Sequence, residues 1–271
     1  MRRLHLVELE DLAWFPAVLR DGGTAYLEFA VRISGHAKLL VPKIAAALKQ
    51  TGSTQIVDLC SGGGGPVRVI ADELARSGTP VGVRLTDFFP NLRAFARAAA
   101  GTDGRITFEP TSIDAAQVPA RLTGFRTIFN AFHHFRPADA RRILVDAATA
   151  NRPIGVFEVV SREALPLLAL LTAPIAVILT VPFWRPFRWS WLFWSWVVPV
   201  MPLFILWDGV VSWLRIHSVE ELQEMVADID APNYTWDIGT IKLGNAPAHA
   251  TYLIGMPTLI GMPTLIGMPT P

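Results

Sequence analysis

Between about residue 54 and residue 160, short apolar runs alternate with stretches of helical character. This alternation is typical of βα units and therefore of a parallel sheet. We expect five strands, at residues 55–59, 81–86, 106–109, 126–130 and 154–160. We expect helices at residues 66–77, 90–100 and 137–150, each beginning with a proline that a first helical turn tolerates. The predicted fold class is therefore α/β, a Rossmann-like, doubly wound and mostly parallel sheet.

The first expected strand runs directly into a glycine-rich turn, whose residues are Cys60, Ser61, Gly62, Gly63 and Gly64. A strand, a glycine turn and a helix start form an adenosyl-binding loop, because glycine lets the backbone approach a ligand closely. A dinucleotide loop needs a further glycine or alanine three residues after Gly64, where this chain has Val67. Asp58, at the end of the strand, would repel a pyrophosphate but attracts the ammonium and the sulfonium of S-adenosylmethionine (SAM). The loop therefore favours SAM over NAD.

Two further carboxylates follow the next two strands. Asp87 lies about 25 residues beyond Gly62, where a carboxylate can accept hydrogen bonds from both ribose hydroxyls. Phe88 comes next and can lie along the adenine ring. Ile113 and Asp114 follow the third strand, where a carboxylate can accept a hydrogen bond from the exocyclic adenine amine. The alternative for each aspartate is turn chemistry, since Asp favours turns and caps in any protein.

At these positions the chain resembles the class I SAM-dependent methyltransferases, particularly the bacterial small-molecule enzymes similar to quinone and lipid methyltransferases. The matching segments are residues 57–64, 85–87, 112–114 and 129–135. The resemblance implies that the glycine loop holds the methionyl part of SAM, with Asp87 on the ribose, Asp114 on the adenine and Asn130 at the same site. Cys60 and Ser61 depart from the pattern, because the family often has glycine and another small residue there. The resemblance covers about residues 54–160 and the closing helix and strands.

Two histidines follow the fourth strand, at the end of the sheet where the methyl acceptor should arrive. Methyl transfer from a sulfonium is an in-line displacement, so a general base is needed only when the nucleophile carries a proton of high pKa. His133 or His134 can take a hydroxyl proton near neutral pH. Glu158, within the fifth strand, is a further polar candidate in the same cleft. The alternative is that the two histidines only cap or pack the turn.

Residues 1–53 are expected to form a helical cover over the cofactor, and residues 54–163 the SAM-binding core. Arg20 and Tyr26 lie in a polar and aromatic cluster of the cover, and either can reach the SAM carboxylate or the acceptor. Trp14 and Phe15 are better explained by packing against the sheet.

The apolar residues of the chain are concentrated after the fifth strand. Hydrophobic residues make up 51% of the chain and charged residues 17%, and residues 164–184 and 189–207 hold no charged side chain. Each run is long enough to span a bilayer, but prolines interrupt both, and Arg185 and Arg188 in the link oppose a two-span hairpin. The tryptophans around this link are typical of an interfacial anchor: Trp184, Trp189, Trp191, Trp194 and Trp196.

We therefore expect residues 164–216 to be a hydrophobic helical insertion. Its apolar part, residues 164–207, is predicted to form a helical hairpin that dips into one leaflet of a membrane or covers a greasy acceptor cleft. A fully buried hairpin is the alternative.

After the insertion, residues 217–258 are expected to complete the sheet. Ser218 and Glu221 are placed for the capping box of a helix. The expected elements are this helix at residues 219–228 and two strands at residues 234–243 and 248–255, paired as an antiparallel hairpin. The sequence Leu-Ile-Gly-Met-Pro-Thr repeats three times from Leu253, and residues 259–271 are expected to be a repetitive tail.

Composition narrows the partners and the compartment. Lys+Arg of 24 against Asp+Glu of 23 give a formal net charge of +1, so no global field gathers nucleic acid. The single cysteine, Cys60, excludes an internal disulfide, and we expect no metal site. We expect a cytoplasmic protein held peripherally or monotopically at the inner face of the membrane. The predicted function is a SAM-dependent methyltransferase of a lipophilic small molecule; the alternative is a non-catalytic SAM-binding or membrane-associated scaffold.

Overall fold

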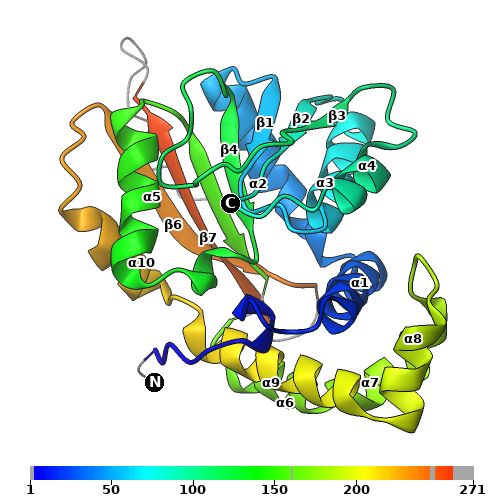
Figure 1. Ribbon diagram of the computed structural model, residues 1–271. Coiled ribbons are helices and arrows are strands. Elements are labelled where there is room, and N and C mark those ends of the chain that lie inside the picture. The colour runs from blue at the N-terminus through cyan, green and yellow to red at the C-terminus, as the bar shows by residue number, and fades with distance from the viewer. Residues whose placement is uncertain (1–2, 160, 245–247, 259–271) are drawn as a thin grey trace.

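A central sheet organises the protein (Figure 1). The structure is a computed structural model, and it describes residues 3–159, 161–244 and 248–258. The sheet has seven strands in the order β3-β2-β1-β4-β5-β7-β6. They are β1 (Gln55–Asp58), β2 (Gly82–Leu85), β3 (Ile106–Phe108), β4 (Phe125–Phe129), β5 (Ile154–Glu158), β6 (Tyr234–Lys242) and β7 (His249–Pro257). Strands β1 to β5 pair in parallel, whereas β7 is antiparallel to both β5 and β6. The predicted α/β fold, a mostly parallel sheet with a C-terminal antiparallel pair, is confirmed.

Helices cover both faces of the sheet, because side chains on its central strands alternate between the two faces. Ile56 and Val57 are neighbours on β1, both are buried, and they belong to cores on opposite faces. The helices over one core are α2 (His36–Thr51), α3 (Gly65–Arg76) and α4 (Leu92–Ala99). The helices over the other core are α5 (Pro137–Thr149) and α10 (Val219–Ala227).

The observed helices and strands begin and end within about two residues of the predicted bounds. Capping side chains set the start of two of the helices. α4 begins at Leu92 and not at Pro90, because Asn91 Oδ1 accepts the Ala94 N–H at 3.1 Å and caps the helix. The capping box of α10 is present: Ser218 Oγ accepts the Glu221 N–H, and Glu221 Oε2 accepts the Ser218 N–H. The last residue of the expected fifth strand, at position 160, and the expected tail lie outside the described residues.

The N-terminal residues lie against the loop that follows β4. A helical turn, η1 (Leu9–Asp11), precedes α1 (Ala17–Ser34), which contacts α3 and the insertion. Phe15 is buried against Phe204 of the insertion, with ring centroids 5.0 Å apart, whereas Trp14 is 72% exposed. The expectation that both side chains pack on the sheet is wrong, because the insertion and not the sheet lies behind this segment.

The insertion is a layer of broken helices beneath the sheet in Figure 1. They are α6 (Ala164–Leu171), α7 (Ala173–Thr180), η3 (Val181–Phe183), α8 (Trp189–Leu192), η4 (Phe193–Val197) and α9 (Val200–Arg215). Each arm of the expected helical hairpin is a bent pair of helices, with bends of 46° and 84°, and α6 and α7 of the first arm contact α9 of the second. Pro174 and Pro199 stand at the two breaks, where each starts a new helix. No single described helix is long and apolar enough to cross a membrane, but the two bent pairs pass that test by length and composition.

A third core joins the insertion to α1. The insertion contributes buried side chains that lie beside Leu19 of α1: Trp184, Trp191 and Met201. Gly22 of α1 makes room for this contact, since a Cβ at that position would lie 2.8 Å from the Met201 sulfur. The insertion therefore folds together with the N-terminal helix.

Candidate functional site

The glycine loop connects β1 to α3 in a conformation that the sequence explains. Gly64 has φ +75°, a left-handed value that glycine adopts without strain, and it forms the N-cap of α3. Gly63 faces α1, where an added Cβ would lie 2.8 Å from Thr24 Cγ2 and would also meet the Glu28 carboxylate. The loop is therefore closed on one side by α1, and glycine is required there for close approach.

Asp58 ties together the strand ends beneath this loop. Its carboxylate accepts a hydrogen bond from Thr127 Oγ1 of β4 at 2.7 Å, and its carbonyl accepts one from Thr86 Oγ1 at 2.9 Å. Burial raises the pKa of Asp58 to about 7, although hydrogen bonds from Ser61 and Thr127 oppose that rise. No ion pair of Asp58 is found among the residues that the structure describes. Neither threonine was predicted: Thr86 directly follows β2, and Thr127 lies in the middle of β4, where nothing in the sequence marks it.

Asp87, predicted to hold the ribose of SAM, faces the glycine loop. Its Oδ2 accepts the Gly62 N–H and its Oδ1 accepts the Phe89 N–H, both at 2.9 Å. Each carboxylate oxygen has a second lone pair, so the group can still accept hydrogen bonds from a ligand. The structure therefore brings Asp87 into contact with Gly62, which lies 25 residues before it in the sequence.

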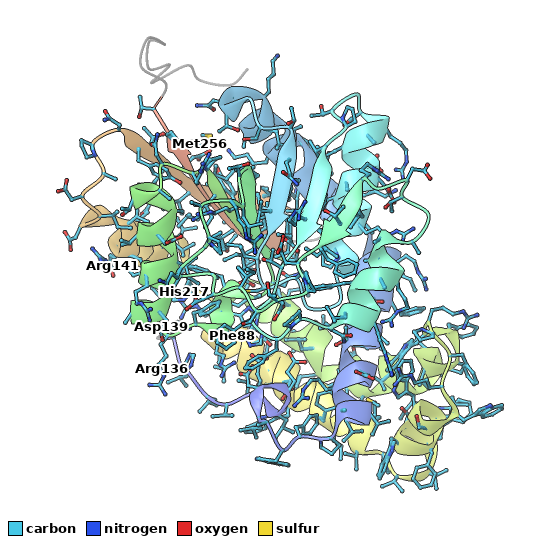
Figure 2. All side chains as sticks on the ribbon, turned by 45° about the horizontal axis from the view of Figure 1, so that its top comes forward. Phe88, Arg136, Asp139, Arg141, His217 and Met256 are labelled. Atoms are coloured by element: carbon cyan, nitrogen blue, oxygen red, sulfur yellow. The ribbon has the colours of Figure 1, made fainter. Side chains whose placement is uncertain are left out.

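The loops after β2 and β3 are held side by side. The Ile113 N–H donates to the Asp87 carbonyl at 2.9 Å, and Ser112 Oγ donates to the Phe88 carbonyl at 2.6 Å. Figure 2 shows Phe88 in the loop region between the sheet and the helices of the insertion. Its ring is half exposed. Asp114 Oδ1 accepts the Ala116 N–H at 2.8 Å, so this aspartate does form the turn that was its alternative role.

Asn130 and Cys60 are two further residues of the predicted cofactor set. Asn130 Oδ1 accepts the Val159 N–H at 2.7 Å and joins the ends of β4 and β5. Cys60 has φ +56°, and burial raises the pKa of its thiol. Asn130 therefore uses its side-chain oxygen within the fold, whereas Cys60 is the first residue of the glycine loop.

His133 is held by Glu158. The Glu158 carboxylate accepts the His133 N–H at 3.0 Å and contacts its Nδ1 at 2.9 Å. Burial alone would raise the pKa of Glu158, but the charge of His133 and its hydrogen bonds hold that pKa below the usual range. A carboxylate on Nδ1 fixes the ring in one orientation and leaves Nε2 for other chemistry.

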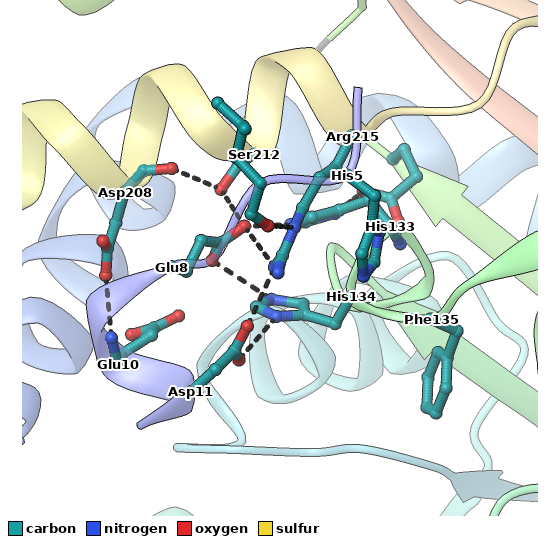
Figure 3. A network of polar contacts seen from close by, with 12 residues as sticks. His5, Glu8, Glu10, Asp11, His133, His134, Phe135, Asp208, Ser212 and Arg215 are labelled. Carbon is teal, nitrogen blue, oxygen red and sulfur yellow. Dashed lines mark hydrogen bonds and ion pairs between the residues drawn. The ribbon is translucent and has the colours of Figure 1, made fainter. Parts of the chain in front are cut away.

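Figure 3 shows that the N-terminal segment meets the two histidines in a network of charges. Glu8 lies 3.7 Å from Nε2 of both His133 and His134, and His134 Nδ1 contacts Asp11 at 3.0 Å. Burial lowers the pKa of His134, but the bond to Asp11 and the nearby carboxylates outweigh it and raise that pKa to about 9. Arg215 Nη1 reaches both Glu8, at 3.0 Å, and Asp11, at 2.9 Å.

Glu8, His133 and His134 have ligand atoms close enough together to hold a metal ion. The Arg215 guanidinium already supplies the cation that this group of carboxylates needs, so we assign no metal there. Sequence reasoning missed Glu8, Asp11 and Arg215, since these residues join positions about 200 apart in the chain.

Arg20 and Tyr26 were predicted to reach the SAM carboxylate or the acceptor. In the described structure their side chains contact other residues of the chain. Arg20 donates to the carbonyls of Glu10 and Leu12, at 3.1 and 2.8 Å, and so fixes η1. The Tyr26 ring packs against Trp184 of the insertion, with the two ring centroids 5.5 Å apart. Glu28 of α1, which was not predicted, contacts the glycine loop together with Thr24: a Cβ at Gly65 would lie 2.9 Å from the Glu28 Cγ.

Comparisons with known proteins identify the fold. No protein-family model and no curated protein sequence matches the chain. The structure is similar to the plantazolicin methyltransferase BpumL in complex with SAH, with a TM-score of 0.58, 11% identity, and coverage of 92% of this chain and 94% of that one. It is also similar to the plantazolicin methyltransferase BamL in complex with SAH, with a TM-score of 0.55, 9% identity and coverage of 88% and 90%. The pyocyanin biosynthetic protein PhzM gives a TM-score of 0.50 at 14% identity, but the match spans 84% of this chain and only 56% of PhzM. The chain therefore shares the fold of the two plantazolicin methyltransferases.

Proposed function

We propose that the chain is a SAM-dependent methyltransferase that acts on a lipophilic small molecule at the cytoplasmic surface of a membrane. The observation that carries the proposal is the meeting of Asp58, Asp87 and the glycine loop at the carboxyl ends of β1 and β2. The fold shared with two methyltransferases in complex with SAH supports it.

The charges at the loop favour SAM over a dinucleotide. Among the described residues, neither Asp58 nor Asp87 forms an ion pair, and Glu28 is a further carboxylate against the loop. Burial raises the pKa of Glu28, although Arg97 and Arg32 oppose the rise. Such a site stabilises the ammonium and the sulfonium of SAM and repels a pyrophosphate.

For a hydroxyl acceptor, His133 is the proposed general base and Glu158 its positioning residue. The contact between His133 Nδ1 and Glu158, at 2.9 Å, supports this assignment because it orients the ring. Nε2 faces Glu8 beneath the N-terminal segment, so the acceptor reaches it only if residues 3–11 move aside. This burial is the observation that favours the second candidate function, a SAM-binding protein without turnover.

The outer surface of the insertion supports the membrane part of the proposal. Its exposed large apolar side chains are Leu165, Leu168, Leu171, Ile175, Ile178, Leu179, Phe183, Phe187, Trp189, Phe193, Trp196, Val197, Val198, Leu203 and Trp207. Soluble monomers rarely leave so many apolar side chains together in water, so we propose that a lipid leaflet covers this surface. The fully buried hairpin is not what the described residues form.

Calorimetry and methyl transfer test the proposal together. We expect the purified chain to bind SAM and its product S-adenosylhomocysteine (SAH), and not NAD. Asp103→Asn, an exposed carboxylate outside the site, is the matched control for Asp87→Asn. Binding of SAH without transfer of a methyl group to any membrane-extracted compound supports the non-catalytic candidate, and equal SAH affinity in all three proteins contradicts the assignment of the site.

Flotation tests the membrane surface separately. We expect the chain to rise with phosphatidylcholine vesicles, and expect Leu179→Ser with Trp189→Ser to remain with the soluble fraction because both side chains lie on the exposed face. Equal flotation of the variant and the parent contradicts the assignment of this surface.

A further inference from the structure

A cationic pocket lies where α1, α4 and the link between α7 and α8 meet. Its volume is about 210 Å³, and four arginines line it: Arg93 and Arg97 of α4 with Arg185 and Arg188 of the link. Two carboxylates, Asp21 and Glu28 of α1, line the same pocket. The proposed methyl transfer uses none of these arginines.

The arginines outnumber their partners. Arg188 pairs with Asp21 at 2.8 Å and also lies over the Trp191 ring, 5.2 Å from its centroid. In the part of the chain that the structure describes, the Arg185 side chain donates one hydrogen bond, to the Trp184 carbonyl at 3.2 Å. Within the described residues, the side chains of Arg93 and Arg97 form no hydrogen bond or ion pair, although they lie one turn apart on α4. Four guanidinium groups against two carboxylates leave an excess of positive charge, which suits an anionic ligand.

The pocket borders the apolar face of the insertion. Three exposed aromatic residues flank Arg185 and Arg188 in the sequence. They are Phe183, Phe187 and Trp189, which are 60%, 40% and 78% exposed. On its other side, Glu28 separates the pocket from the glycine loop. A ligand in the pocket thus has the proposed cofactor site on one side and the proposed membrane surface on the other.

We propose that this pocket binds the phosphate of an anionic lipid head group. Arginine is the side chain best suited to phosphate, because its planar fork can donate two parallel hydrogen bonds to the oxygens. The lipid source is argued from the exposed aromatic side chains at the rim, since these would lie in the leaflet while the arginines reach its head groups. The inference rests on the membrane surface of the proposed function and names the lipid class that surface selects.

The test compares two double variants that remove the same charge. Arg93→Gln with Arg97→Gln removes both charges from the α4 side of the pocket. Within the described residues neither side chain forms a hydrogen bond or an ion pair, and the charge of Arg97 acts on Glu28. Arg76→Gln with Arg142→Gln is the control, because both residues are exposed and lie outside the pocket. Calorimetry uses short-chain phosphatidylglycerol below its micellar concentration, and inorganic phosphate as a second probe. Flotation uses phosphatidylcholine vesicles with and without phosphatidylglycerol.

We expect the parent to bind the short-chain lipid, the pocket variant to bind it at least about tenfold more weakly, and the control to stay within about threefold of the parent. Equal affinity in the three proteins, or no binding by the parent, overturns the inference. Equally tight binding of inorganic phosphate, with no preference for anionic vesicles, overturns the lipid assignment. SAH binding by all three proteins verifies that they are folded.

The two proposals fail differently. If flotation is equal with neutral and anionic vesicles and the short-chain lipid does not bind, the proposed lipid pocket is contradicted and the proposed membrane surface is not. If the short-chain lipid binds in a way that depends on the pocket arginines but the chain floats with no vesicle, the proposed membrane surface is contradicted and the proposed lipid pocket is not.

Discussion

The buried carboxylate of Asp58 gives a prediction whose size follows from the structure. Burial raises its pKa from 3.8 to about 7, so ionisation opposes folding in the ligand-free protein. A difference of about three pKa units corresponds to roughly 4 kcal/mol once the group is fully ionised. Asp58→Asn removes that charge while its amide oxygen can still accept the hydrogen bond from Thr127. We therefore expect the variant to be more stable than the parent at pH 8 by up to about 4 kcal/mol, or roughly 8 °C in Tm.

The pH dependence follows from the raised pKa of Asp58. Because the folded state binds this proton more tightly than the unfolded state, the penalty is absent below about pH 3.8 and grows until about pH 7. The advantage of Asp58→Asn should fall to less than half of its pH 8 value at pH 5. The same substitution should weaken SAM binding at pH 8 by about tenfold or more, because it removes a charge that faces a cationic ligand.

Thermal unfolding of the ligand-free proteins at pH 5 and pH 8, with SAM calorimetry at pH 8, measures both effects. Asp103→Asn is again the control, since the exposed carboxylate at φ +49° tolerates asparagine. An Asp58→Asn variant that is no more stable than the parent at pH 8, or whose advantage is equal at the two pH values, refutes the reasoning.

Three further predictions concern separate parts of the molecule. Asp87→Ala should weaken SAH binding by about 1.5 to 3 kcal/mol, the usual range for hydrogen bonds to a charged group, and calorimetry measures it; equal affinity would exclude Asp87 from the site. If the acceptor is a hydroxyl, His133→Ala should lower turnover by about 100-fold or more with SAM affinity unchanged, and full turnover would assign His133 to structure. Trp184→Ala should destabilise the protein by about 3 to 5 kcal/mol in denaturant titration, because the ring is fully buried between α1 and the insertion. A loss of under about 1 kcal/mol would contradict that packing.

The βα core was predictable because its signals are local. A strand, a glycine turn and a helix start follow one another within residues 55–66, and Asp87 follows β2 directly, so pattern and spacing located both. The charge network was not predictable, because Glu8 and Arg215 meet only after the sheet and the insertion have folded. Glu28 was missed for the same reason, since nothing in α1 indicates which turn faces the glycine loop.

The insertion shows what composition can and cannot predict. Its apolar character was evident, but an apolar run does not say which side chains face inward: Trp184 and Trp191 are buried, whereas Trp189 is exposed. The prolines were read as interruptions of a hairpin, and they in fact divide it into bent pairs. The insertion also shares a core with Leu19 and Phe15, so a chain without it would expose both side chains.

Transfer of a radiolabelled methyl group from SAM tests the central claim most directly. The purified protein is incubated with labelled SAM and an organic extract of membranes, and the label is counted in the organic phase. We predict label in the organic phase with the parent and with Asp103→Asn, and a loss of most of it with Asp87→Ala, whose carboxylate faces the glycine loop. Label in the organic phase that is equal with Asp87→Ala, or absent with a parent that binds SAM, would contradict the account.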